Sequence, residues 1–453
     1  MVATTEREDP DEIAQRQMMN LFLGTARAYG GTWSEIFGGI TDRRAAWKIH
    51  YPIEAMLFSG VLLFLCQLGA RRQVNYRLRG NRAVGKKYRA LFGVEEVPHG
   101  DSLNYSYQQL QVEEVQEAVC RLMDKVMGQE AFRKQRLFGV YFLVAMDGTG
   151  VLVYHEKHCD YCLTRKLSNG SVLYYHPVLE AKLVTAEGYA LSLMTEFIEN
   201  TDPTASKQDC ELKAFYRLTD RLKQRFPRLD FCLLLDGLFA GGPTLERCDK
   251  NHWKYVITLT DADLPSVNEE FEALLTLPPD SRLTLPLADG GQQAFRWVNA
   301  IDYGDSENHR HALNVVDCVE SRPNAQGLLT TSKFKWITNF TLLAHNVAKV
   351  ANQAGRLRWK IENEGFNCQK NGGFALEHAF SHHDIAHKVF YLLLQLAIIF
   401  FQLMAKSTFL AHAFPSGLGS LKNIAFRLLE AWRNLRLEDQ AFLALTAFPD
   451  DTS

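Results

Sequence analysis

The stretch YFLVAMDGTG (141–150) decides the predicted fold of this chain. The residues before Asp147 are uncharged and apolar or aromatic, which is typical of a buried strand, and a glycine follows the aspartate. The stretch DFCLLLDGLFAGG (230–242) repeats this arrangement around Asp236. Since α/β sheets bind their ligands at the carboxyl ends of strands, we expect both aspartates to lie at one edge of a sheet.

The periodicity of the flanking sequence predicts strands at 141–147 and 151–155, two longer strands within 176–198, a helix over 207–226, and strands at 230–236 and 254–261. This order indicates a mixed α/β sheet with flanking helices. We expect a helical N-terminal region (1–138), a catalytic core in two parts (139–263 and 332–405), a β-rich insertion (264–331) and a helical C-terminal tail (406–453).

Bulk properties exclude some functions. A chain of 453 residues has room for a sizeable core. Its net charge of -2 gives no global attraction to nucleic acid, so a DNA-binding surface requires local clusters of Lys and Arg. The nine cysteines are scattered, and no apolar run follows a basic stretch at the N-terminus, so we expect a cytoplasmic protein. The apolar runs 56–69 and 389–405 fall short of a membrane span of about 20 residues and predict buried core helices.

A third acid comes from RLRWKIENEGFN (356–367), which offers Glu362 and Glu364. On an α-helix each residue turns about 100°, so Arg358 shares a face with Glu362, whereas Glu364 lies roughly 200° away from Glu362. Trp359 is expected to turn away and pack into the core. This geometry favours Glu362 as the partner of Asp147 and Asp236.

Three converging carboxylates repel one another unless a cation joins them. Hard oxygen ligands suit Mg²⁺ or Mn²⁺. A pair of such ions about 3.5–4 Å apart can activate a water or a 3′-hydroxyl and stabilise the leaving oxygen, which is the chemistry of phosphodiester cleavage and transfer.

The series AMDGTG, KQDCE, LLLDGLFA, ITNF and RWKIENEGFNCQKNGGFALEH, in this order, resembles the DDE transposases of bacterial insertion sequences with a Tyr-Arg-Glu-Lys signature. The resemblance covers residues 45 to 405 and implies that Asp147, Asp236 and Glu362 are the catalytic, metal-binding triad. Arg358 and Lys370 match the signature arginine and lysine, which the resemblance implies contact DNA. The chain departs from the signature at Gly355, where the tyrosine would fall, and Lys370 lies one residue further from the glutamate than usual.

The resemblance implies an RNase H-like core and a cut-and-paste reaction in which a homodimer holds the terminal inverted repeats of a mobile element and joins them to target DNA. Two alternatives stay open. One is a DNA-binding descendant without catalysis, and the other is a metal-dependent nuclease without strand transfer.

The stretch RRQVNYRLRGNRAVGKKYR (71–89) contains no acid and predicts a local basic patch. With Tyr76 and Tyr88 interleaved, it favours contacts with DNA phosphates, for which Arg77, Arg79 and Arg82 are the candidates.

Histidines and cysteines raise further possibilities. The stretch HEKHCDYC (155–162) contains His158, Cys159 and Cys162, and His176 follows it. These residues have the spacing of zinc ligands, but only one C-x-x-C is present. A loop that packs near the active site with its polar groups hydrogen-bonded is therefore favoured over structural zinc. The histidines at 378, 382, 383 and 387 are expected to form a polar face toward DNA or solvent. Asp209 and Glu211 are expected to cap a helix, and Cys210 has no neighbouring base that would make it a nucleophile.

Overall fold

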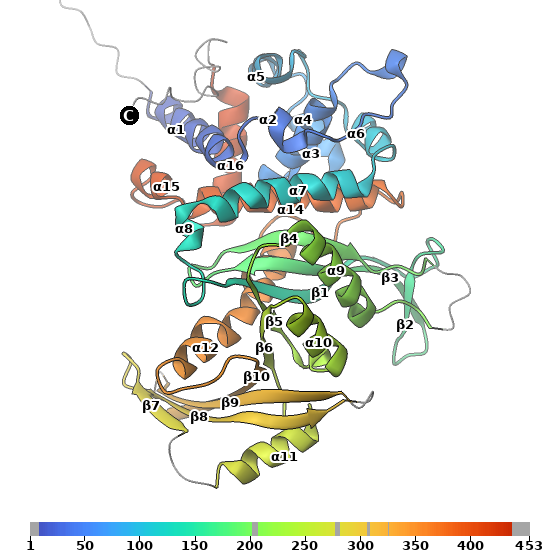
Figure 1. The fold of residues 1–453 in the computed structure, drawn as a ribbon. Coiled ribbons are helices and arrows are strands. Elements are labelled where there is room, and N and C mark those ends of the chain that lie inside the picture. The colour runs from blue at the N-terminus through green and yellow to red at the C-terminus, as the bar shows by residue number, and fades with distance from the viewer. Residues whose placement is uncertain (1–8, 202–206, 277–280, 306–308, 325, 437–453) are drawn as a thin grey trace, which may run out of the picture.

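The computed structural model describes residues 9–201, 207–276, 281–305, 309–324 and 326–436. Figure 1 shows a layer of helices above a large sheet, with helices beside the sheet and a second group of strands below it. The fold is therefore mixed α/β, with a large mixed sheet flanked by helices and an N-terminal helical region.

The N-terminal region is helical, as predicted. Its α-helices are α1 (Pro10–Thr25), α2 (Trp33–Phe37), α3 (Ile53–Leu65), α4 (Arg71–Arg77), α5 (Arg82–Phe92), α6 (Gly100–Tyr107), α7 (Val112–Gly128) and α8 (Glu130–Arg133). Local signals set the starts of several helices. For example, Asp9 accepts a hydrogen bond from Asp11 N ahead of α1, and Asn81 accepts from Ala83 N and Val84 N at the start of α5.

The two long apolar runs form core helices, as predicted. They are α3 and α14 (Ala386–Ala405), which pack against each other, and α14 also contacts α7 and β4. By length and composition α14 could cross a membrane, but 89% of its most apolar window is buried inside the fold. Within α14 the Gln402 side chain accepts from Ala190 N at 2.9 Å, so a polar group of this helix bonds to the sheet.

The remaining helices follow or flank the strands: α9 (Glu211–Arg225), α10 (Gly242–Lys250), α11 (Pro265–Leu274), α12 (Val347–Gln353), α13 (Cys368–Asn371), α15 (Thr408–Ala413) and α16 (Leu421–Asn434). The predicted C-terminal tail contains α15 and α16, of which α16 packs against α1 and α5, and its residues 437–453 lie outside the described part of the chain.

The sheet contains the strands β1 (Phe142–Tyr154), β2 (Leu163–Lys166), β3 (Val172–Val184), β4 (Ala190–Phe197), β5 (Phe231–Leu235), β6 (Lys254–Thr258), β7 (Arg282–Pro286), β8 (Gln292–Gly304), β9 (Arg310–Pro323) and β10 (Leu329–Thr338). Their order is β2-β3-β1-β5-β6-β10-β9-β8-β7, and β4 also pairs with β3. The β1–β5 and β5–β6 pairs are parallel, and the other pairs are antiparallel.

Three predicted elements differ in the structure. The two strands predicted within 141–155 are one long strand, β1 (Phe142–Tyr154), because the chain stays extended through Gly148 and Gly150 while it pairs with β3. The β-rich segment begins with the helix α11, and its strands continue the main sheet through the pairing of β10 with β6. The segment that carries Glu362 is not a regular α-helix but a 3₁₀ turn, η4 (Gly355–Trp359), followed by a π-helical stretch, η5 (Ile361–Asn367).

A buried ion pair on β3 ties this segment to the sheet. Lys182 and Glu180 are both fully buried, with Lys182 Nζ 3.1 Å from Glu180 Oε2. Lys182 also donates to Gln395 Oε1 of α14 at 2.8 Å, and Gln395 in turn bonds to Gln369 of α13. Burial lowers the pKa of Lys182, and the negative charge of Glu180 opposes that shift. The network therefore connects β3, α13 and α14.

We expect the substitution Lys182→Met to destabilise the fold by about 3–5 kcal/mol, because it leaves the buried Glu180 carboxylate without its cation. The matched control is Lys134→Met, which removes an exposed pair with Glu130 and should change the free energy of unfolding by no more than about 0.5 kcal/mol. Urea unfolding of the two variants measures the difference. A cost below about 1 kcal/mol for Lys182→Met would contradict this interpretation of the network.

Candidate active site

Asp147 and Asp236 lie side by side at the carboxyl end of β5, which runs parallel to β1. The pairing of β1 with β5 sets Phe142 beside Phe231 and Ala145 beside Leu234, and the same register continued by two residues places Asp147 beside Asp236. Asp236 directly follows the last residue of β5, whereas Asp147 lies inside β1, which runs on because β3 still pairs with it. The prediction that Asp147 ends its strand is therefore wrong, but both acids lie at the carboxyl end of β5.

Backbone amides orient both aspartates. Gly148 N donates to Asp147 Oδ1 at 2.9 Å, and Leu238 N donates to Asp236 Oδ1 at 3.0 Å, where Asp236 caps the short 3₁₀ turn η3 (Gly237–Phe239). In each case one carboxylate oxygen is held by the chain, which restricts the direction of the other.

Arg358 connects Glu362 to Asp147. Its Nη2 donates to Glu362 Oε1 at 2.8 Å and its Nη1 approaches Asp147 Oδ2 at 3.5 Å, while the arginine itself is 5% exposed. Glu362 and Asp147 are 215 residues apart in the chain, so η5 must pack against β1 for this contact to form.

Glu364 points elsewhere. Its carboxylate pairs with Lys360 and lies near Gly188. Its backbone carbonyl accepts a hydrogen bond from the Gln402 side chain of α14, with Gln402 Nε2 at 3.1 Å from Glu364 O. Both glutamates thus have a basic partner four residues earlier, but only Glu362 shares its partner with Asp147.

Burial is the main influence on the ionisation of Asp147. Burial, together with the negative charges of Glu362 and Asp236, raises the pKa of Asp147 to about 7, while Arg358 and the Gly148 amide oppose the shift. Arg358 therefore does not fully offset the burial of this carboxylate beside two other acids.

Glu211 is a fourth acid at this site, although its sequence context predicted only helix capping. It is the first residue of α9, whose N-cap Cys210 makes no side-chain capping bond. The Glu211 carboxylate lies over Gly148, since a Cβ built on that glycine would clash with Glu211 Oε1. Burial raises the pKa of Glu211, and Asp236 adds to the shift. Asp209 bonds instead to the amide of Cys210 and to Arg217.

Trp359 and Gly355 also differ from expectation. Trp359 is 47% exposed rather than packed in the core, and the Arg358 guanidinium lies over its ring at 4.4 Å. Gly355 is packed so closely that an added Cβ would lie 2.6 Å from the Trp336 ring. A tyrosine at this position would require Trp336 to move.

Lys370 lies in α13 and pairs with Glu377 at 2.9 Å. The residues that surround Asp147 electrostatically are Arg358, Glu362 and Asp236, and Lys370 is not among them. Its expected contact with DNA stays a prediction.

The basic patch is only partly exposed. Arg79 is paired with Glu96 at 2.6 Å, Lys87 is buried and donates to the carbonyls of Trp432 and Leu435, and Tyr88 is buried against Ser59. The side chains of this patch that are exposed are Arg72, Tyr76, Arg77, Arg82, Lys86 and Arg89. Tyr88 therefore serves the core rather than a phosphate surface.

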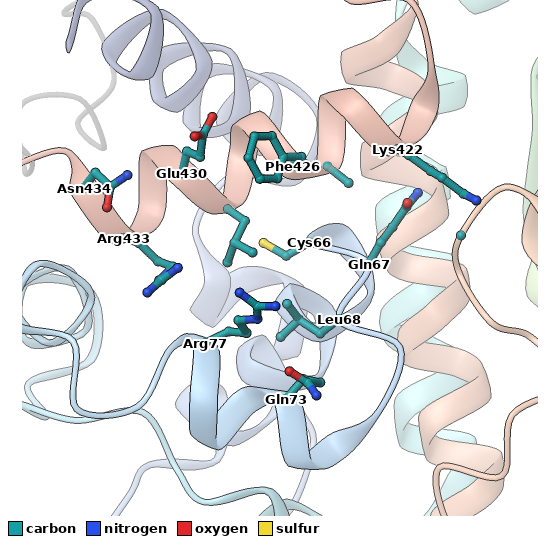
Figure 2. A pocket seen from close by; sticks show the side chains of 13 residues that line it. Cys66, Gln67, Leu68, Gln73, Arg77, Lys422, Phe426, Glu430, Arg433 and Asn434 are labelled. Atoms are coloured by element: carbon teal, nitrogen blue, oxygen red, sulfur yellow. The ribbon is translucent and has the colours of Figure 1, made fainter. Parts of the chain in front are cut away.

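Part of this patch faces a pocket of about 630 Å³ between the α4 region and α16. Figure 2 shows Arg77 on one side of it and Arg433 on the other, with Lys422 further along α16. A second pocket, of about 520 Å³, is lined by Arg82, Lys86 and Arg89. The contribution of α16 to this basic surface was not predicted, because Lys422 and Arg433 lie far from 71–89 in the chain.

The four histidines do not share one helix face. His378, His382 and His383 precede α14, and His382 and His383 are exposed, whereas His387 is buried inside α14. Burial lowers the pKa of His387 to about 3, so this side chain belongs to the core and not to a surface toward DNA.

Comparisons with known proteins name no relative: no protein-family model matches the chain, and no curated protein matches it significantly.

The raised pKa of Asp147 predicts a pH dependence in metal-free buffer. Its folded pKa of about 7 lies above the value of about 4 in an unfolded chain, so the wild type loses stability as pH rises from about 4 to about 7. Asp147→Asn removes this loss, and its stability relative to wild type should increase over that range and level off above it. Thermal unfolding in EDTA at a series of pH values measures the difference.

The matched control is Glu35→Gln. Lys125 lowers the pKa of Glu35 through a hydrogen bond, so the stability that Glu35 contributes is lost as pH falls, which is the opposite sign. A difference between Asp147→Asn and wild type that does not change with pH would show that Asp147 ionises normally in the fold.

Proposed function

We propose that this chain is a metal-dependent DNA transposase of the DDE type, which cuts the ends of a mobile element and joins them to target DNA. The observation that carries the proposal is the convergence of Asp147, Asp236 and Glu362 from three separate elements, with Arg358 between the first and the last. These are the residues that the resemblance to DDE transposases assigns to the catalytic triad.

The strand arrangement supports an RNase H-like core. Strands β4, β3 and β1 are antiparallel neighbours, and β5 and β6 follow in parallel, which is the arrangement of strands in that fold. Asp147 lies on β1, Asp236 directly follows the neighbouring strand β5, and Glu362 comes from a segment packed against β1. The β-rich segment 264–331 lies between the last parallel strand and the glutamate.

The donor set fits a hard divalent cation. Asp147, Asp236 and Glu362 would hold Mg²⁺ or Mn²⁺, because carboxylate oxygens are the ligands these ions prefer and the buried Asp147 is undercompensated by Arg358 alone. When bound, such ions supply activation of a water or 3′-hydroxyl and stabilisation of the leaving oxygen.

The remaining residues of the site position these acids. The Gly148 and Leu238 amides fix one oxygen of each aspartate, and Arg358 holds Glu362 toward Asp147. Glu211 is close enough to the glycine after Asp147 to add a fourth carboxylate. The exposed ring of Trp359, beneath the Arg358 guanidinium, borders the site toward solvent.

The decisive experiment uses the DNA that flanks the gene on both sides, cloned around a marker, and measures single-turnover cleavage with Mg²⁺. Glu362→Gln should slow cleavage by at least a thousandfold, or about 4 kcal/mol, because the amide keeps the shape but loses the charge that holds metal. Glu364→Gln is the matched control and should stay within about tenfold of wild type, because Glu364 pairs with Lys360 away from Asp147.

The outcomes separate the functions. Cleavage together with joining of pre-cut ends that carry a 3′-hydroxyl supports a transposase, and cleavage without joining makes the chain a nuclease. Binding alone, with no cleavage in either metal, makes it a DNA-binding protein. Cleavage that persists in EDTA, or a dead Glu364→Gln enzyme beside an active Glu362→Gln enzyme, would contradict the assigned site.

The basic patch predicts a salt-dependent contribution to DNA affinity. Because Arg79 is paired with Glu96, the informative variant replaces the exposed Arg77, Arg82 and Lys86 with Ala. If these residues bind phosphates, the slope of log K against log salt should fall by roughly 0.9 for each phosphate that is no longer neutralised. The control is Lys134→Ala on α8, whose side chain is exposed and paired with Glu130. An unchanged slope in the triple variant would place the DNA elsewhere.

A further inference from the structure

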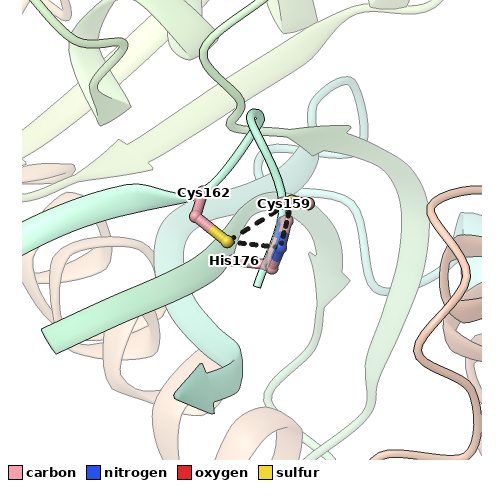
Figure 3. A group of neighbouring side chains, drawn as sticks. All are labelled: Cys159, Cys162 and His176. Atoms are coloured by element: carbon pink, nitrogen blue, oxygen red, sulfur yellow. Dashed lines mark hydrogen bonds between the residues drawn. The ribbon is translucent and has the colours of Figure 1, made fainter. Parts of the chain in front are cut away.

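A second cluster of metal-ligand residues lies beyond the C-terminal end of β1. The loop between β1 and β2 carries Cys159 and Cys162, and β3 carries His176. Figure 3 shows the two thiols and the imidazole turned toward one another. The sulfur atoms are 3.4 Å apart, and His176 Nε2 lies 3.4 Å from Cys159 Sγ and 3.2 Å from Cys162 Sγ.

These separations suit a metal better than mutual hydrogen bonds. A single imidazole nitrogen directed at two sulfurs can satisfy one of them at a time, and thiols are weak donors. Around a tetrahedral Zn²⁺ with bonds of about 2.3 Å to sulfur and about 2.0 Å to nitrogen, the ligand atoms lie about 3.5–3.8 Å apart. The three donors would move by only a few tenths of an ångström to reach that geometry.

The surroundings of His176 match those of a zinc-binding histidine. Its other ring nitrogen, Nδ1, lies 3.9 Å from Glu199 Oε1, and both atoms are buried and lack a hydrogen-bond partner among the described residues. Lys388 holds the same carboxylate through its other oxygen. A ligating histidine commonly directs its second N–H to a carboxylate, which orients the ring.

His158, in the same loop, is the candidate for a fourth ligand. Its ring lies outside the group of three donors that already stand within 4.8 Å of one another, so it would have to move toward the ion on binding. Its Nε2 lies 2.9 Å from the carbonyl oxygen of His382, so the neutral ring that donates this bond keeps the Nδ1 lone pair. The ring also stacks on Tyr154, with 4.3 Å between the ring centroids. Here again the nitrogen that is not offered to the metal bonds to a backbone carbonyl.

The loop backbone is already fixed in place. Asn200 N donates to Tyr161 O at 3.1 Å, and the Asn200 side chain donates to Cys162 O at 2.9 Å. The backbone at Tyr161 and Cys162 is thus held to the segment after β4 before any ion binds, which lowers the conformational cost of binding.

We propose that Cys159, Cys162, His176 and His158 bind one structural Zn²⁺. Thiolate sulfur and imidazole nitrogen select zinc over the Mg²⁺ or Mn²⁺ suited to carboxylates, and on binding the two thiol protons pass to solvent. The ion links the β1–β2 loop to β3, and through His158 to the segment before α14. This proposal does not depend on the proposed transposase function.

The test begins with the full-length protein, reduced and passed through gel filtration in EDTA to strip weakly held ions. Elemental analysis should find about one zinc per chain, and it should find the same in Asp147→Asn, whose altered carboxylate belongs to the other site. The Cys159→Ser/Cys162→Ser variant should lose the zinc, whereas Cys210→Ser, at an exposed cysteine outside the cluster, should keep it. His158→Ala should weaken zinc binding by about 10- to 100-fold.

A measurement on the wild type tests the site even if the cysteine variants fail to fold. Replacing the zinc with Co²⁺ should give a thiolate-to-cobalt charge-transfer band in the near ultraviolet. The proposal is overturned if the reduced wild type binds neither zinc nor cobalt, if Cys159 and Cys162 form a disulfide in place of the site, or if the double serine variant keeps its full zinc content. Wild-type zinc affinity in His158→Ala would remove His158 from the ligand set and overturn the four-residue site.

Discussion

The structure depends on a lysine that is buried where a charge is costly. Lys182 has no access to solvent, so its ammonium group must be satisfied by Glu180 on its own strand and by Gln395 on α14. Ser192, Thr195 and Tyr391 complete the shell of Glu180. Since these partners come from β4 and α14, the polar network permits one arrangement of sheet and helix, where apolar contacts alone would tolerate several.

This network also sets the position of Glu362. Gly365 packs on the Lys182 side chain, with a Cβ position 3.3 Å from Lys182 Cδ, and the lysine ammonium lies 5.7 Å from the centre of the Phe366 ring. Gln369, which exchanges hydrogen bonds with Gln395, follows in α13. The segment from η5 to α13 is therefore anchored to β3, and Glu362 at its start is directed toward β1. The π-helical winding of η5 lies where this anchoring and the contact of Arg358 with Asp147 must both be met.

Much of the fold could be predicted because the elements that matter have strong local patterns. The uncharged runs before Asp147 and Asp236 predicted two strands of one sheet, and the 3.6-residue periodicity predicted α9 and the core helices. The choice of Glu362 over Glu364 followed from the spacing to Arg358, and that contact is present at 2.8 Å although the segment is not an α-helix. The four-residue spacing brings the two side chains together in either winding.

What could not be predicted depends on contacts between distant parts of the chain. Glu211 has the sequence of a helix start, and only the packing of α9 against β3 and β4 carries its carboxylate over Gly148. Trp359 was expected in the core because it is apolar. Arg358 is buried instead, because its guanidinium pairs with the carboxylates of Asp147 and Glu362. His387 was expected at the surface because it is polar, yet α14 is buried on nearly every side. In each case the surroundings of the side chain are set by residues that are distant in the sequence and adjacent in the fold.

The long strand β1 connects the two proposed metal centres, and their donor sets keep the ions apart. Asp147 and the loop after Tyr154 are separated by seven residues of strand, or roughly 23 Å at about 3.3 Å per residue. The first centre offers carboxylate oxygens with a compensating arginine, and the second offers two thiols and imidazoles next to a lysine-held glutamate. Hard cations bind poorly to sulfur and exchange readily, while zinc held by thiolates does not. In the proposed arrangement, a permanent zinc ion in the loop after Tyr154 stabilises that loop without occupying the carboxylates around Asp147, which stay available for Mg²⁺ or Mn²⁺.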